Sequence, residues 1–175
     1  MDGNNLEGVV LKCNKVAMDY LQYDNFKESL NLLKRAEDML NNEKEIPDRF
    51  KLLGITLNNL GCYYKRRKQF NVALEYLKNA LKVELNIEND SISIASTHLN
   101  ISAIYSAIKK HGQAFNHAKT ALKLLEQNPP AEPTKSYATS MVISYYNAGA
   151  ELEFMGRCRR LRSTWRMASA LLKEN

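Results

Sequence analysis

The chain has 175 residues, of which 45% are hydrophobic and 25% are charged. This balance is normal for a soluble domain of ordinary size that folds by itself. The formal net charge of +6 and a pI near 9.2 favour contact with something acidic. Composition leaves the choice among nucleic acid, anionic lipid and acidic protein open.

The sequence gives no sign of secretion or of a membrane span. It contains no apolar run long enough for a signal peptide or a spanning helix. Cys13, Cys62 and Cys158 are odd in number and far apart, which argues against a disulfide framework and fits a reducing compartment. We therefore expect a cytoplasmic protein. No cysteine or histidine cluster suggests a metal, and we expect no cofactor.

Apolar residues recur three and four positions apart along the chain, and strand-like alternation is absent. This periodicity predicts an all-α fold of eight helices. In chain order, Asp24, Asp90 and Thr134 are suitable N-caps, while Pro129 and Pro130 end the sixth helix. The breaks between helices fall at 23–25, 41–48, 68–69, 86–90, 110–112, 128–133 and 156.

The helices are arranged in a repeated unit. The stretch "ITLNNLGCYYKRRKQFNVALEYLKNAL" aligns with "STHLNISAIYSAIKKHGQAFNHAKTAL" at an offset of 41 residues. A period of this length indicates stacked helical units. The alignment places Thr56 on Thr97, Asn59 on Asn100, Tyr64 on Tyr105, Ala73 on Ala114 and Ala80 on Ala121.

Two columns extend the repeat to four units. In the second helix of each unit the column is all alanine, with spacings of 44, 41 and 47 residues. Small residues in the first helix let neighbouring backbones approach closely. The small column is Ala17, Gly61, Ser102 and Gly149, and the alanine column is Ala36, Ala80, Ala121 and Ala168.

This spacing of small, aromatic and alanine residues resembles the tetratricopeptide repeat (TPR) family. "TLNNLGCYY" is similar to the first-helix signature of the long repeats of kinesin light chains. The resemblance implies a right-handed superhelical solenoid of four helix-turn-helix repeats in a single domain, 1–175. Leu152, Leu161 and Trp165 depart from the pattern in the fourth unit, as terminal repeats often do. The repeats span about 6–42, 47–87, 90–127 and 134–173.

Within this family the first helices line a concave groove, and the resemblance places an asparagine column there. Asn59, Asn100 and Asn147 share one repeat position, where the first unit has Lys15. Such a ladder of carboxamides would bond to the backbone of an extended peptide. Met18, Cys62 and Tyr146 are further groove candidates. The alternative is that Asn59 and Asn100 bond within the scaffold, or that asparagine is simply abundant in this chain.

Basic residues cluster where each first helix gives way to the second, and stacking would gather them on one edge. Cations there would also complement the helix dipole, which is a purely structural explanation. The functional alternative is docking against an acidic protein surface. Nucleic acid is disfavoured because no aromatic residues interleave with the arginines. The basic edge comprises Lys65, Arg66, Arg67, Lys68, Lys109, Lys110, Arg157, Arg159, Arg160 and Arg162.

No nucleophile elbow, phosphate loop or paired carboxylates indicate an enzyme, and His98, His111 and His117 lack evident partners. We expect a protein–protein interaction scaffold or adaptor that binds an extended peptide. The alternative is a structural subunit of a larger assembly, cytoskeletal or ciliary, which docks through the basic edge and uncapped repeat ends. The amphipathic C-terminal helix would then favour self-association.

Overall fold

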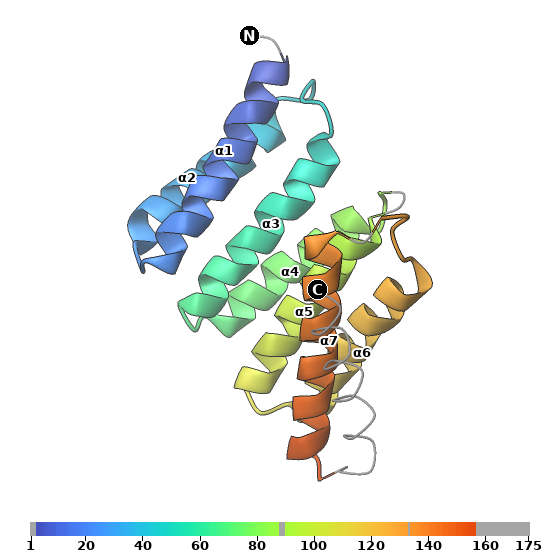
Figure 1. Ribbon diagram of the computed structural model, residues 1–175. Helices are drawn as coiled ribbons and strands as arrows, with labels where there is room; N and C mark the ends of the chain where they lie inside the picture. Colours follow the sequence, from blue (N-terminus) through green and yellow to red (C-terminus); the bar gives the residue numbers. More distant parts are fainter. Residues whose placement is uncertain (1–2, 88–89, 133, 157–175) are drawn as a thin grey trace. The chain divides into compact units, whose positions relative to one another are not determined.

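The computed structural model describes residues 3–87, 90–132 and 134–156, and these form seven α-helices and no strand (Figure 1). The predicted all-α fold is confirmed for this part of the chain. The eighth predicted helix falls within 157–175, outside the described residues, and stays a prediction.

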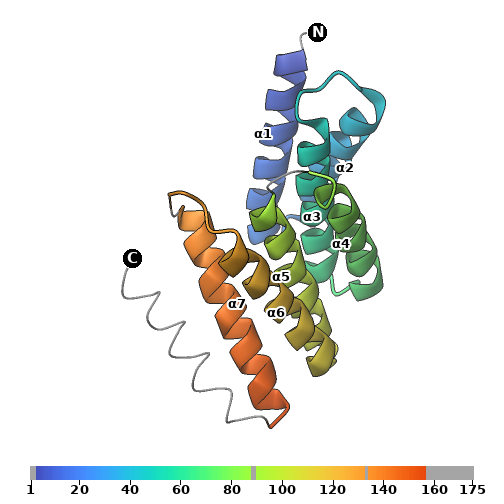
Figure 2. The same ribbon diagram turned by 90° about the vertical axis from the view of Figure 1, so that its right-hand side faces the viewer.

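Contacts divide the chain into two compact units, residues 1–89 and 90–175. The helix pairs α1–α2, α3–α4 and α5–α6 pack as antiparallel hairpins (Figure 2). The single domain and the right-handed superhelix stay predictions. The first unit contains α1 (Gly3–Gln22), α2 (Phe26–Asn42), α3 (Arg49–Arg66) and α4 (Phe70–Glu84); the second contains α5 (Ser91–Ala107), α6 (His111–Gln127) and α7 (Lys135–Phe154).

The alanine column lies in the core of each unit. Ala36, Ala80 and Ala121 are fully buried on the second helices, while Ala168 lies outside the described residues. Ala36 packs with Val10 of α1 and with the α2–α3 connection, and Ala121 packs among residues of α5, α6 and α7. A methyl side chain at this position lets the second helix lie close to its neighbours.

Gly61 shows why the first-helix column must be small. A Cβ atom added there would lie 2.5 Å from Cγ of Leu77 and 3.4 Å from the carbonyl oxygen of Ala73. Both of these residues belong to α4. The absence of a side chain at Gly61 therefore allows α3 and α4 to lie this close together. Ser102 fills the same position in α5 by donating a hydrogen bond to the carbonyl of Ala114, at 2.8 Å.

The turn inside each repeat has a fixed geometry. Asp24, Lys68, Lys109 and Gly156 all have positive φ, between 58° and 67°, and three of these four residues are not glycine. They occupy one repeat position, with the spacings of 44, 41 and 47 residues found for the alanines. In the first three repeats, the backbone N–H of the residue that follows the left-handed one donates to the carbonyl of a tyrosine in the last turn of the first helix. This is the bond of a Schellman C-cap. These bonds are Asn25 to Tyr20, Gln69 to Tyr64 and Lys110 to Tyr105, at 3.0, 2.9 and 2.8 Å.

One of the three expected caps is confirmed. The Thr134 side chain accepts from the backbone N–H of Tyr137 at 3.1 Å. Asp90 is the N-cap residue of α5 but makes no side-chain cap bond, and Asn25, not Asp24, precedes α2. Asp24 cannot cap because it is the left-handed residue of the turn. Among the described helices, none is both long and apolar enough to cross a membrane.

Candidate binding faces

The first unit places four of the predicted groove residues on α1 and α3. Lys15 is exposed, while Met18, Asn59 and Cys62 are partly buried. Met18 and Cys62 pack against a core cluster that includes Leu33. Burial raises the pKa of the Cys62 thiol, against the opposing charge of Lys65. Cys62 is therefore a protonated, apolar contributor to this face, because the thiolate is the reactive form.

Asn59 ends a chain of hydrogen bonds that begins in the core. Its Nδ2 donates to Oδ1 of Asn14 at 2.8 Å, and Asn14 Nδ2 donates to Oγ1 of Thr56 at 2.9 Å. Thr56 donates in turn to the carbonyl of Leu52, and Asn14 also donates to the carbonyl of Val10. Asn14 and Thr56 are buried, at 4% and 0% exposure. The bonds therefore join α1 to α3 through a polar path inside an apolar interface, which we call the asparagine relay.

The donors and acceptors of the asparagine relay can be assigned in only one way. A carbonyl cannot donate, so the single hydrogen of Thr56 Oγ1 goes to Leu52 and Thr56 must accept from Asn14. The carbonyl of Val10 can only accept, so it also requires that the Asn14 atom facing it and Thr56 be the donor Nδ2. Asn14 Oδ1 then faces Asn59, whose Nδ2 must donate. Asn59 Oδ1 makes no hydrogen bond within the described part of the chain.

Sequence reasoning missed Asn14 as the partner of Asn59. Part of the alternative explanation holds, because Asn59 does bond within the scaffold. The bond uses one donor of the carboxamide and leaves the acceptor available. The signal lay in the buried threonine position, Thr56 and Thr97, which indicates a polar path beside the asparagine column.

The second unit contributes three predicted groove residues from α5 and α7. Asn100 and Asn147 are partly exposed, and Tyr146 is 55% exposed. The Asn147 side chain makes no hydrogen bond to the rest of the described chain. Ile143 is 41% exposed one turn before it. This face therefore combines carboxamides with exposed apolar side chains.

The described basic residues lie at the end of α3 and in the turns within the repeats, and their side chains differ in availability. Arg66 Nε donates to Oδ1 of Asp24 at 2.8 Å, and the Arg67 guanidinium lies 4.9 Å from the ring centroid of Phe26. Both side chains therefore tie α3 to the first repeat.

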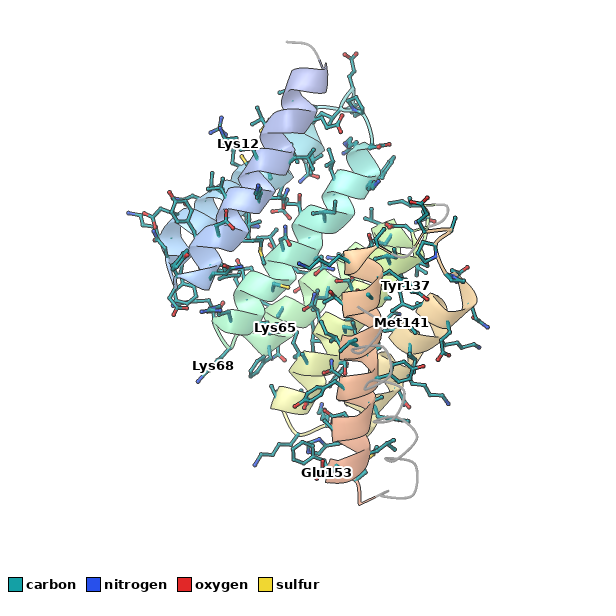
Figure 3. All side chains as sticks on the ribbon, viewed as in Figure 1. Lys12, Lys65, Lys68, Tyr137, Met141 and Glu153 are labelled. Atoms are coloured by element: carbon teal, nitrogen blue, oxygen red, sulfur yellow. The ribbon has the colours of Figure 1, made fainter. Side chains whose placement is uncertain are left out.

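Lys68 is exposed in the α3–α4 turn, and Lys65 is partly buried at the end of α3 (Figure 3). Lys109 and Lys110 are exposed in the α5–α6 turn. The available part of the edge is thus smaller than the sequence indicates. Arg157, Arg159, Arg160 and Arg162 lie outside the described residues.

The histidines do have partners, which sequence reasoning missed. His98 and His117 approach within 2.8 Å through their Nδ1 atoms, with ring centroids 5.1 Å apart. Burial and the neighbouring His117 lower the pKa of His98 to about 4. At neutral pH His98 is therefore uncharged, and one proton lies between the two facing Nδ1 atoms. Doubly protonated rings would each carry a hydrogen on the facing atoms and could not remain at this distance.

His111 bonds to the buried Glu151 of α7 at 2.7 Å and stacks on Phe154. In the equivalent contact between α2 and α3, both positions are aromatic. The equivalent pair there is Phe26 and Tyr63, which meet edge to face at 6.1 Å. The signal in the sequence was a histidine and a carboxylate replacing two aromatic residues at matched repeat positions.

The comparisons with known proteins agree with this geometry. Residues 52–127, from α3 to α6, match the family model of the tetratricopeptide repeat. The predicted resemblance is therefore confirmed, and this part of the chain is made of tetratricopeptide repeats, which generally mediate protein–protein interaction.

Among solved structures, the chain is similar to the crystal structure of BtubC (BKLC) from P. vanneervenii. The TM-score is 0.64 at 14% sequence identity, over 99% of this chain and 83% of that chain. At this identity the likeness is one of fold, and it supports a TPR-like solenoid. No curated protein sequence matches the chain significantly.

Proposed function

We propose that this protein is a protein-binding module whose first helices hold an extended peptide through Asn59, Asn100 and Asn147. The proposal assigns it a binding role and no catalytic one. Its free thiols at Cys13 and Cys62 fit a cytoplasmic site of action.

The asparagine relay carries the proposal. It fixes Asn59 with its donor turned inward, so the remaining Oδ1 is an oriented acceptor suited to a peptide N–H. A side chain held in advance loses less entropy on binding. Asn147 adds a carboxamide with both donors and its acceptor available among the described residues. Exposed Ile143 and Tyr146 suit a peptide with aliphatic or aromatic side chains.

The test starts from peptides that the parent protein selects out of a displayed library of unstructured sequences. Their affinity is then measured for the triple variant Asn59→Ala, Asn100→Ala, Asn147→Ala. Loss of three hydrogen bonds at about 1 kcal/mol each predicts roughly a hundredfold weaker binding. N-methylation of single peptide amides would reveal which N–H the Asn59 acceptor uses.

The matched control removes three exposed asparagines from the second helices, namely Asn31, Asn71 and Asn116. This control should bind the selected peptides like the parent. Equal affinity of parent and first-helix variant, with thermal melts unchanged, would refute the asparagine contact.

A second candidate function is docking on an acidic protein surface through the exposed lysines of the turns. Lys68 and Lys109 favour it because both hold a left-handed conformation that suits glycine better. Retaining lysine at the cost of stability suggests a role for its charge. Reversal of charge at Lys68, Lys109 and Lys110 would weaken such docking and leave peptide binding unchanged. Membership of a cytoskeletal or ciliary assembly would belong to this candidate.

A further inference from the structure

Helix α7 carries a lengthwise stripe of accessible side chains. Their positions follow the helical period, so they share one side of the helix. All are exposed or partly exposed, whereas Met141, Tyr145 and Leu152 on the other side are buried. The stripe, called the α7 stripe below, comprises Lys135, Thr139, Val142, Ile143, Tyr146 and Glu153.

The centre of the α7 stripe is apolar. Ile143 and Tyr146 are 41% and 55% exposed, and Val142 lies between them and the core. Helices α5 and α6 pack on α7, with Met141 and Tyr145 joining the core of the unit. The apolar centre is therefore accessible on the side of α7 turned away from those core residues.

The two ends of the α7 stripe carry opposite charges. Lys135 begins the helix and Glu153 is next to its last residue, and neither forms an ion pair within the described part of the chain. Figure 3 shows Glu153 at the opposite end of α7 from Tyr137. Eighteen residues of helix separate the charges by about 27 Å. Since the Debye length is about 8 Å at physiological ionic strength, the two do not interact within one chain.

If two copies of α7 are related by a two-fold axis through the middle of the helix, the charges of one copy match those of the other. In an antiparallel pairing centred near residue 144, Lys135 faces Glu153 of the second copy at both ends. Val142 faces Tyr146 of the second copy in the centre. Such an interface is self-complementary, as two-fold symmetry requires. We propose that the α7 stripe binds the α7 stripe of a second copy of this chain, forming a reversible antiparallel dimer.

The charge pattern selects this occupant over others. Each copy of α7 supplies the lysine of one ion pair and the glutamate of the other, a pattern that an unrelated helix would match only by coincidence. The exposed side of α1 is a poor alternative because Lys12, Lys15 and Asp19 surround its exposed Leu11 with charge. Ile143 and Tyr146 also belong to the proposed peptide contacts, so dimerisation and peptide binding would compete for this part of α7. Lys135 and Glu153 lie outside those contacts, and their reversal therefore tests the dimer separately.

Sedimentation velocity of the full chain at low salt, over a range of concentrations, tests the proposal. The parent should show a concentration-dependent dimer. Lys135→Glu or Glu153→Lys alone places like charges opposite each other at both ends. Each should raise the dissociation constant about tenfold. Lys119→Glu on α6 is the control, because that exposed lysine lies outside the α7 stripe.

Mixing provides the decisive result. In an equimolar mixture, the glutamates of the Lys135→Glu variant face the lysines of the Glu153→Lys variant. The mixture should therefore dimerise as the parent does, and so should the double variant K135E/E153K. A monomeric parent at every concentration, a dimer insensitive to the single reversals, or a mixture that stays weak would each overturn the proposal. Circular dichroism melts would show that the variants remain folded.

Discussion

At the scale of single residues, the asparagine relay makes Asn14 a position where one atom matters. Asn14→Asp replaces the donor facing Val10 and Thr56 by an oxygen, so acceptors face each other in a buried site. We expect a loss of about 2 kcal/mol in the free energy of unfolding. Urea titration measures it. Asn71→Asp on the exposed side of α4 should change stability by less than about 0.5 kcal/mol.

Ser29 is the opposite case, because its hydroxyl is fully buried without a hydrogen-bond partner in the described chain. The equivalent positions of the next two repeats are Ala73 and Ala114, both fully buried. Ser29→Ala should therefore stabilise the protein by about 1 kcal/mol. Ser102→Ala, which removes a buried hydroxyl that does have a partner, should destabilise it by a similar amount. Loss of stability in both variants would show that Ser29 is also bonded.

At the scale of helices and turns, three residues other than glycine hold the left-handed conformation that closes a repeat. Replacing Lys68 or Lys109 by glycine removes the Cβ strain and should raise the free energy of unfolding by about 0.5 to 1 kcal/mol each. Lys110 has φ −91° as the N-cap residue of α6. Lys110→Gly should give no gain, and thermal melts would distinguish the two kinds of position.

The helices were predictable from sequence because their apolar and small residues repeat with a fixed spacing. The repeated turn positions were also visible, but their left-handed geometry was not, since aspartate and lysine do not favour it. The partners of Asn59 and of the histidines were hidden for another reason. Each bond joins different helices, and a repeat alignment identifies equivalent residues without showing which of them meet.

At the scale of the whole molecule, all three histidines belong to the second unit. The pKa of His98 is lowered to about 4 from an ordinary 6.5, so the folded unit binds fewer protons than the unfolded chain. Its contribution to stability is complete above pH 6.5 and is lost as the pH falls toward 4. Hydrogen exchange should therefore show protection of α5 and α6 falling about tenfold between pH 7 and 5.

The first unit offers the internal comparison, because α1 to α4 contain no histidine and should keep their protection over the same range. His98→Gln should remove most of the difference between the units. Equal loss of protection in both units would mean that acid acts through carboxylates instead of the His98–His117 pair.

The repeated turn geometry shows where a foreign segment can be inserted into this chain. Three residues join the helices of each described hairpin, at 23–25, 67–69 and 108–110. Longer segments join successive hairpins, at 43–48, 85–90 and 128–134. The described residues of these longer segments lack the repeated Schellman bonds, so an epitope or a fluorescent probe inserted there should leave the hairpins intact. Segment 128–134 is the most suitable site, because it already contains two adjacent prolines that separate the helices on either side.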